Sequence, residues 1–161
     1  MPVNKKLNDA LNDEIGLELF AHSQYLAMGC YLDARGFSNL AQFFYRQAEE
    51  EKEHALRIIK YLNEAGGTVR IPAVDEPKHE FASLEELAQL FLDQEQHVTD
   101  QFYRMVELSL KEKDYATHQF LQWFVEEQVE EVDTATRLLQ LVQMAGEENA
   151  FHVEMMVAHW E

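Results

Sequence analysis

The sequence predicts an all-α fold: an antiparallel bundle of four long helices with a short fifth helix near the C-terminal end. Apolar residues recur at the three- and four-residue spacings of a helical stripe over four long stretches. The two-residue alternation that is typical of a half-buried strand does not occur. Only 6 glycines and 3 prolines interrupt the 161 residues, and most of them fall between these stretches. We therefore expect four helices joined by three connections.

The first two stretches predict a helical hairpin. The first covers about residues 7–32 and ends near Gly36. The second begins with Ser38, which we expect to be its N-cap because a serine hydroxyl can accept from the free amides of a first turn. This helix ends at a pair of glycines that begins with Gly66, since glycine readily adopts the positive φ of a helix C-cap. A tight turn is expected between the two helices.

One long connection follows the glycine pair, over about residues 66–82, and contains two of the three prolines. Ser83 and Glu86 then form an S-x-x-E capping box directly before a new apolar stripe. The third helix is therefore expected to begin here, far along the chain from the end of the second.

A polar break at residues 111–114 separates the third stretch from the fourth, which Gly146 ends. A short tail helix is expected over residues 149–160. Short, long and short connections in this order are typical of two antiparallel hairpins joined by one crossover, a known four-helix-bundle topology.

The composition suits one compact domain over residues 1–161, because 47% hydrophobic residues can form a core of sufficient size. The formal charge of -17, from 30 acidic and 13 basic residues, disfavours nucleic acid and anionic membranes as partners. Neither a signal peptide nor a run of about 18 apolar residues is present, so we expect a cytoplasmic protein. The single Cys30 lies within a helical pattern and is expected to be a small buried hydrophobe.

Each long stretch carries acidic or metal-binding residues in the middle of its apolar stripe. In a bundle these residues would meet at one buried point, where like charges repel and lose their hydration. Each such charge costs several kcal/mol unless a proton or a bound cation neutralises it. The residues are Glu18 in the first stretch, Glu51 and His54 in the second, Glu95 in the third, and Gln128 and Glu131 in the fourth.

The pair Glu51 and His54 is spaced so that both side chains point from adjacent helical turns to the same place. Taken alone, such an E-x-x-H pair more often belongs to a solvated, salt-bridging helix face. Glu51, however, lies between two alanines on the apolar stripe, and Glu18 and Glu95 occupy similar positions. We therefore interpret the set as a buried metal site rather than an ordinary bundle with paired or protonated polar groups.

The chemical types of the candidate ligands indicate which metal the site would bind. Carboxylates with one imidazole suit iron or manganese better than copper, and the lack of paired cysteines argues against structural zinc or an iron-sulfur cluster. A carboxylate such as Glu51 can bridge two ions whose outer sides are held by other residues, which leaves positions open for O2 or peroxide. Two ferrous ions can then give two electrons together.

Two further groups allow both a functional and a structural interpretation. Tyr25, two turns beyond Glu18, either hydrogen-bonds a ligand or donates an electron, or it is a core aromatic with a satisfied hydroxyl. The acidic run at residues 126–131 forms either a third cation site or a solvated face. The third-site candidates are Glu50, Glu127, Glu130 and Glu131. The histidines interpreted as surface or packing residues are His22, His79, His97, His118, His152 and His159.

These residues resemble the non-haem bacterial ferritins over nearly the whole chain. The matching segments are GLELFAHSQYLAM, QAEEEKEHALRIIKYL, the helix around Glu95, and FLQWFVEEQVEE. The resemblance implies a ferroxidase that binds Fe2+, oxidises it with O2 or H2O2, and stores Fe3+ as a mineral core. It also implies a shell of twenty-four identical subunits around a hollow, acidic interior.

The same resemblance implies a role for each candidate residue. The first iron would be held by Glu18, Glu51 and His54, and the second by Glu51, Glu95 and Glu131, with Gln128 close by. A third iron site would consist of Glu50, Glu127, Glu130 and Glu131. Tyr25 and Trp123 would be the aromatic residues near the centre.

Differences from the related bacterioferritins, a haem-binding group of ferritins, bear on whether this protein binds haem. Those proteins carry a second E-x-x-H on the fourth helix and a haem-ligating Met directly after the bridging Glu. The corresponding positions here are Gln128-x-x-Glu131 and Lys52, so we expect no haem. Two other functions remain as alternatives. A rubrerythrin-like peroxide reductase is disfavoured because a Cys-rich segment is lacking, and a structural or cation-buffering bundle would need no redox chemistry.

Overall fold

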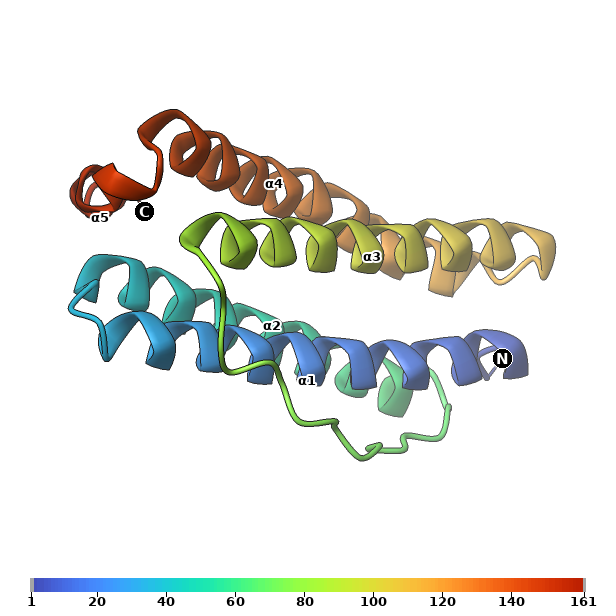
Figure 1. The fold of residues 1–161 in the computed structure, drawn as a ribbon. Coiled ribbons are helices and arrows are strands. Elements are labelled where there is room, and N and C mark those ends of the chain that lie inside the picture. Colours follow the sequence, from blue (N-terminus) through green and yellow to red (C-terminus); the bar gives the residue numbers. More distant parts are fainter. Residues whose placement is uncertain (1, 161) are drawn as a thin grey trace.

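The structure is a computed structural model that describes residues 2–160, and every regular element in this range is helical, as the sequence predicts. Four long helices form two antiparallel hairpins, and a short helix crosses one end of the bundle (Figure 1). The elements are α1 (Lys5–Asp33), α2 (Ser38–Glu64), α3 (Leu84–Lys111), α4 (Tyr115–Ala145), a single 3-10 turn (Glu147–Asn149) and α5 (Ala150–Val157).

The crossover between α2 and α3 runs along α1 from one end of the bundle to the other (Figure 1). Polar side chains of α1 hold it in place. The Asn12 amide donates to the Thr68 carbonyl at 2.8 Å, and the Gln24 amide both donates to and accepts from the Lys78 backbone at 2.9 Å. The free backbone groups of this connection are therefore partly satisfied by the helix beneath it.

The capping signals in the second half of the chain are confirmed. The Glu86 amide donates to the Ser83 hydroxyl at 3.0 Å, and the Glu86 carboxylate accepts from the Ala82 amide at 2.5 Å. Asp114 caps α4 in the same way by accepting from the Thr117 amide at 3.1 Å. At the other end of α4, Gly146 has a φ of 74°, the left-handed conformation expected of a glycine that ends a helix.

The prediction that Ser38 is an N-cap is wrong. Ser38 is the first residue of α2, Phe37 precedes it, and no side chain next to it in sequence caps the helix. The buried carboxylate of Glu154 in α5 performs this task instead, accepting from the Asn39 amide at 2.7 Å and the Leu40 amide at 3.0 Å. The short tail helix thereby satisfies two of the free amides of α2, which no local pattern could reveal.

The prediction that Cys30 is buried is also wrong, because the residue is exposed. It lies two positions from both Met28 and Leu32, which are buried. Two positions correspond to about 200° around a helix, so Cys30 falls on the opposite face of α1. Its sulfur lies 3.8 Å from the Tyr45 hydroxyl of α2.

The core is divided into two hydrophobic clusters, one toward each end of the bundle. One cluster contains Tyr25, Phe44 and Phe91, and the other contains Phe102 and Phe124. On every long helix, the acidic residues of the predicted site fall where one cluster ends and the other begins. Among residues 2–160, no helix is long and apolar enough to cross a membrane.

Candidate metal centre

All four long helices contribute to one buried polar centre between the two clusters. The helix faces that pack the core also bring these polar side chains inward, because each side chain is in register with the apolar stripe of its helix. None of the six is more than 4% exposed. They are Glu18 from α1, Glu51 and His54 from α2, Glu95 from α3, and Gln128 and Glu131 from α4.

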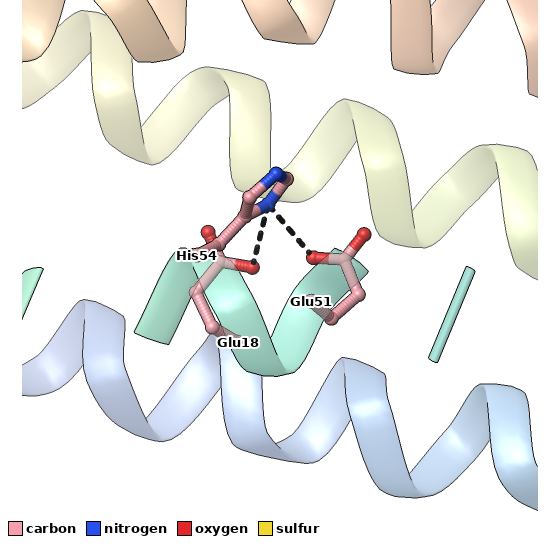
Figure 2. A group of neighbouring side chains, drawn as sticks. All are labelled: Glu18, Glu51 and His54. Atoms are coloured by element: carbon pink, nitrogen blue, oxygen red, sulfur yellow. Dashed lines mark ion pairs between the residues drawn. The ribbon is translucent and has the colours of Figure 1, made fainter. Parts of the chain in front are cut away.

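The first group of ligand atoms consists of Glu18, Glu51 and His54. Figure 2 shows both carboxylates turned toward the same imidazole nitrogen. The His54 Nδ1 lies 3.3 Å from a Glu51 oxygen and 3.8 Å from a Glu18 oxygen. One ligand atom of each residue lies within 4.8 Å of the others, so a single metal ion could contact all three.

A second group consists of Glu51, Glu95 and Glu131, whose carboxylate oxygens also lie within 4.8 Å of one another. Glu51 belongs to both groups. Two ions could therefore bind side by side with Glu51 between them, which is the arrangement that a bridging carboxylate requires. The two groups together use side chains from all four helices of the bundle.

Burial strongly affects the charge of this centre. It raises the pKa of Glu18 and of Glu51 well above the usual range, and the neighbouring carboxylates add to the effect. Burial together with Glu95 and Glu51 raises the pKa of Glu131 to about 11. Burial lowers the pKa of the His54 imidazole, but Glu51, Glu127 and Glu95 together raise it by more, so the net direction is upward. In the absence of a cation, burial therefore favours the protonated form of these carboxylates.

Several buried polar atoms at the centre have no hydrogen-bond partner in the described part of the chain. These atoms are both carboxylate oxygens of Glu18, one oxygen of Glu51, Nδ1 of His54 and the amide oxygen of Gln128. Buried polar groups are otherwise almost always paired in proteins. Unpaired ligand atoms on residues that meet at one buried centre are expected of a metal-binding site, and hard oxygen ligands with one imidazole suit iron.

Tyr25 and Gln128 lie at the edge of the second group. The buried Tyr25 hydroxyl donates to the Glu95 carboxylate, and burial raises the Tyr25 pKa well above its usual value. The Gln128 amide donates to the Thr99 hydroxyl at 3.0 Å and to Glu95 at 3.3 Å. The hydrogen bonds from Tyr25 and Gln128 orient Glu95. The Gln128 carbonyl oxygen has no hydrogen-bond partner among residues 2–160.

The four third-site candidates all line one cavity of about 480 Å³ between α2 and α4. Glu131 is buried and Glu127 is half-buried, and each offers an oxygen to a group with His54 whose atoms lie within 4.8 Å. Glu50 and Glu130 are exposed at the cavity and belong to no such group within residues 2–160. The structure thus places all four at one cavity, but only Glu127 and Glu131 belong to a compact group of possible ligand atoms.

Comparison with known proteins gives the family. The sequence matches the ferritin family, through its ferritin-like domain, over residues 8–145. The chain belongs to the ferritins. It is 40% identical over 152 residues to the bacterial non-heme ferritin of Staphylococcus aureus strain USA300, a match that covers 94% of this chain and 92% of that protein. It is 43% identical over 129 residues to the bacterial non-heme ferritin of Staphylococcus saprophyticus, over 80% of this chain and 77% of that protein.

Solved structures agree with this assignment. The fold of this ferritin superposes on an open pore ferritin of the hyperthermophilic archaeon Archaeoglobus fulgidus with a TM-score of 0.94. The two are 31% identical, and the match covers 99% of this chain and 98% of the other. This ferritin accordingly stores iron and acts as a ferroxidase, an enzyme that oxidises Fe2+.

Besides Glu154, a second buried acidic residue of this ferritin was not predicted from the sequence. Glu14 of α1 is 1% exposed, and its Oε1 atom has no hydrogen-bond partner among residues 2–160. It lies four residues before Glu18 and three after the buried Leu11, which is the spacing of a single helical stripe. That spacing could have revealed it, but the segment GLELFAHSQYLAM that carries the family resemblance begins after it.

Proposed function

We propose that Glu18, Glu51, His54, Glu95 and Glu131 form a di-iron ferroxidase centre within each subunit. The observation that carries this proposal is that two groups of three ligand atoms share Glu51. Iron is the substrate of this reaction, and binding begins when Fe2+ displaces the protons that the buried carboxylates hold. Each ion then occupies one group, and Glu51 fixes the distance between the two.

The paired arrangement explains how O2 can be reduced without releasing a one-electron product. Each Fe2+ gives one electron, so two ions reduce O2 and two protons to H2O2 and become two Fe3+. The same pair can instead reduce H2O2 and two protons to two water molecules. The protons displaced from Glu18 and Glu51 leave to the solvent when Fe2+ binds, before O2 arrives, so the two protons that either reaction consumes come from the surrounding water.

The experiment that tests this function is anaerobic loading of the apoprotein with Fe2+ and rapid mixing with O2, while absorbance and particle size are followed together. We expect fast oxidation that saturates at about two irons per chain, as two metals in one carboxylate site predict. Slow growth of a soluble ferric core should follow. Oxidation without a core would favour a rubrerythrin-like oxidoreductase, and no oxidation would leave a cation-binding bundle.

We further propose that Glu50, Glu127, Glu130 and Glu131 form a third iron site that passes Fe3+ onward. All four line the cavity beside the centre, and His54 is within 4.0 Å of Glu127, so the two sites are contiguous. An ion leaving the buried pair would exchange ligands step by step toward more exposed carboxylates, where water can complete its coordination.

Replacing Glu127 and Glu130 together by Gln should therefore slow repeated turnover more than the first one. We expect the initial oxidation to remain within about two-fold of the wild type and later additions of Fe2+ to be oxidised roughly 10-fold more slowly, the size of effect typical of residues outside the first coordination shell. Glu126→Gln is the matched control, because Glu126 is exposed in the same acidic run but does not line the cavity. Identical kinetics over many turnovers would contradict a third site.

Tyr25→Phe should slow oxidation without removing iron binding. The change deletes only the hydroxyl that donates to Glu95, and the ring remains packed against Phe44 and Phe91. We expect roughly a 10-fold lower rate, as for other groups that orient a metal ligand. Rapid-mixing absorbance measures the rate, and anaerobic Fe2+ titration measures binding. A loss of binding would mean that Tyr25 supports the ligands rather than the electron transfer.

We propose finally that the chain assembles into a cytoplasmic shell of twenty-four subunits around the mineral. The family supports this assembly, and so do the large exposed apolar side chains gathered at α5 and the end of α4, which are typical of an interface. They are Met144, Phe151, Met155 and Met156. Size-exclusion chromatography with light scattering tests the shell directly, and a monomer or dimer would overturn it.

A further inference from the structure

A second, smaller cavity lies between α1 and α3, the two helices that run side by side on the near side of the bundle in Figure 1. Its volume is about 120 Å³, which equals the space of roughly four water molecules in the liquid. The third-site cavity, by contrast, is bounded by α2 and α4. The metal centre therefore has a cavity next to it on each side of the bundle.

Glu14 is the residue that gives this small cavity its chemistry. It lines the cavity and is 1% exposed, and its Oε1 atom has no partner in the described residues. Burial, with smaller contributions from Asp13 and Glu95, raises the pKa of Glu14 to about 8. A carboxyl group in this position carries a penalty that a cation would remove.

Two other oxygen donors line the same cavity. Asp13 is exposed at its rim and Gln101 reaches it from α3. Two carboxylates and an amide oxygen are hard ligands, which suit Mn2+, Mg2+ or Fe2+ when water completes the coordination. Arg104 also lines the cavity, but it is exposed and forms no ion pair within residues 2–160. Once a cation displaces the Glu14 proton, the two carboxylates together outweigh this single positive charge.

The geometry points to a separate binding site for a hydrated divalent cation, formed by Asp13, Glu14 and Gln101 in the cavity between α1 and α3. Glu14 precedes Glu18 by four residues, so their side chains lie one above the other on the same face of α1. A cation at Glu14 is thus one helical turn from a ligand of the first iron. Given the proposed di-iron centre, this site is a staging position for Fe2+ on its way to Glu18.

Binding of Mn2+ to the iron-free protein tests the site without using the oxidation reaction. Paramagnetic resonance of unbound Mn2+ gives the number of ions held per chain. We expect Glu14→Gln to bind one fewer Mn2+ per chain than the wild type. The matched control is Asp100→Asn, which removes an exposed charge of α3 next to Gln101 but does not line the cavity.

The same comparison in a Glu51→Ala background separates this site from the proposed centre. If the site exists, Glu14→Gln still removes one Mn2+ in a protein whose centre is already disabled. Equal Mn2+ binding with and without Glu14→Gln in both backgrounds would overturn the site, whatever the centre does.

Arg104→Gln should tighten Mn2+ binding at the site several-fold, because it removes the one positive charge that lines the cavity. Weaker binding would also overturn the proposal.

The staging role has its own readout. In a protein with an intact centre, Glu14→Gln should mainly raise the Fe2+ concentration needed for the half-maximal oxidation rate, while Asp100→Asn should not change it. Loss of one Mn2+ with no change in the Fe2+ dependence would keep the cation site and overturn its place on the route to Glu18.

Discussion

Glu51→Ala is expected to abolish rapid oxidation of Fe2+ while leaving the fold intact. Glu51 belongs to both groups of ligand atoms, so its loss removes a ligand from each ion and, among residues 2–160, the only carboxylate that the two groups share. Even residues outside the coordination shell change metal affinity or activity by roughly 10- to 100-fold, so a bridging ligand should cost more than about 100-fold in rate. Rapid mixing of Fe2+-loaded protein with O2 measures the effect.

We expect the fold to survive this change because the buried Glu51 carboxyl carries an electrostatic penalty in the iron-free protein. Its pKa is raised by burial and by Glu95 and Glu18, so its ionised form is unfavourable in the folded state. Circular dichroism and particle size should therefore match the wild type. Glu53→Ala is a suitable control, because Glu53 is an exposed residue two positions along α2. Wild-type oxidation kinetics in Glu51→Ala would refute the shared centre.

The iron-free protein is expected to lose stability as pH rises, and Glu14 should account for a measurable part of the loss. The pKa of Glu14 is about 8 in the folded protein, against an ordinary value of 4.5 for a solvated glutamate. Between these values the folded state holds a proton that the unfolded state has released. The contribution of Glu14 is therefore fully present below pH 4.5 and declines as pH rises toward 8.

The size of this effect follows from the pKa difference. At pH 7, the penalty is about 3 kcal/mol, since each pH unit above 4.5 costs about 1.4 kcal/mol. Glu14→Gln cannot ionise, so it should raise the free energy of unfolding by about this amount at pH 7 and by much less at pH 4.5. Denaturant unfolding at matched protein concentration measures both values.

Two comparisons make this result specific. Asp100→Asn removes an exposed carboxylate and should leave the pH dependence of unfolding unchanged. Mn2+ should stabilise the wild type at pH 7 more than Glu14→Gln, because the carboxylates of the metal centre are present in both proteins and only the wild type also has the Glu14 carboxylate, whose penalty the cation relieves. An equal gain in stability at both pH values would instead indicate better packing of the glutamine, and it would contradict the role of ionisation.

Much of this molecule could be predicted from local patterns. Ser83 predicted the start of the third helix and Gly146 predicted the end of the fourth, and the structure confirms both. The polar residues that interrupt the apolar stripes were predicted to be buried, and Glu18, Glu51 and Glu95 are each no more than 1% exposed. These predictions succeed because helical period and capping chemistry act over only a few residues.

Other features depended on contacts between residues far apart in the sequence. The cap of α2 is Glu154, which no pattern near Ser38 could reveal. The exposure of Cys30 depends on which arc of α1 faces α2, and the small cavity beside Glu14 exists only where α1 meets Gln101 of α3. Each of these is set by how the helices pack rather than by the helices themselves.

The sequence by itself determined the helices, their order and the set of polar residues that face inward, because side-chain periodicity fixes which face of a helix is apolar. Only the tertiary structure decided which of those residues share a metal ion. Glu51 lies within reach of both Glu18 and Glu131 because four helices are packed at their observed rotation and height. Such distances depend on the fit of the whole core, which a one-dimensional pattern does not contain.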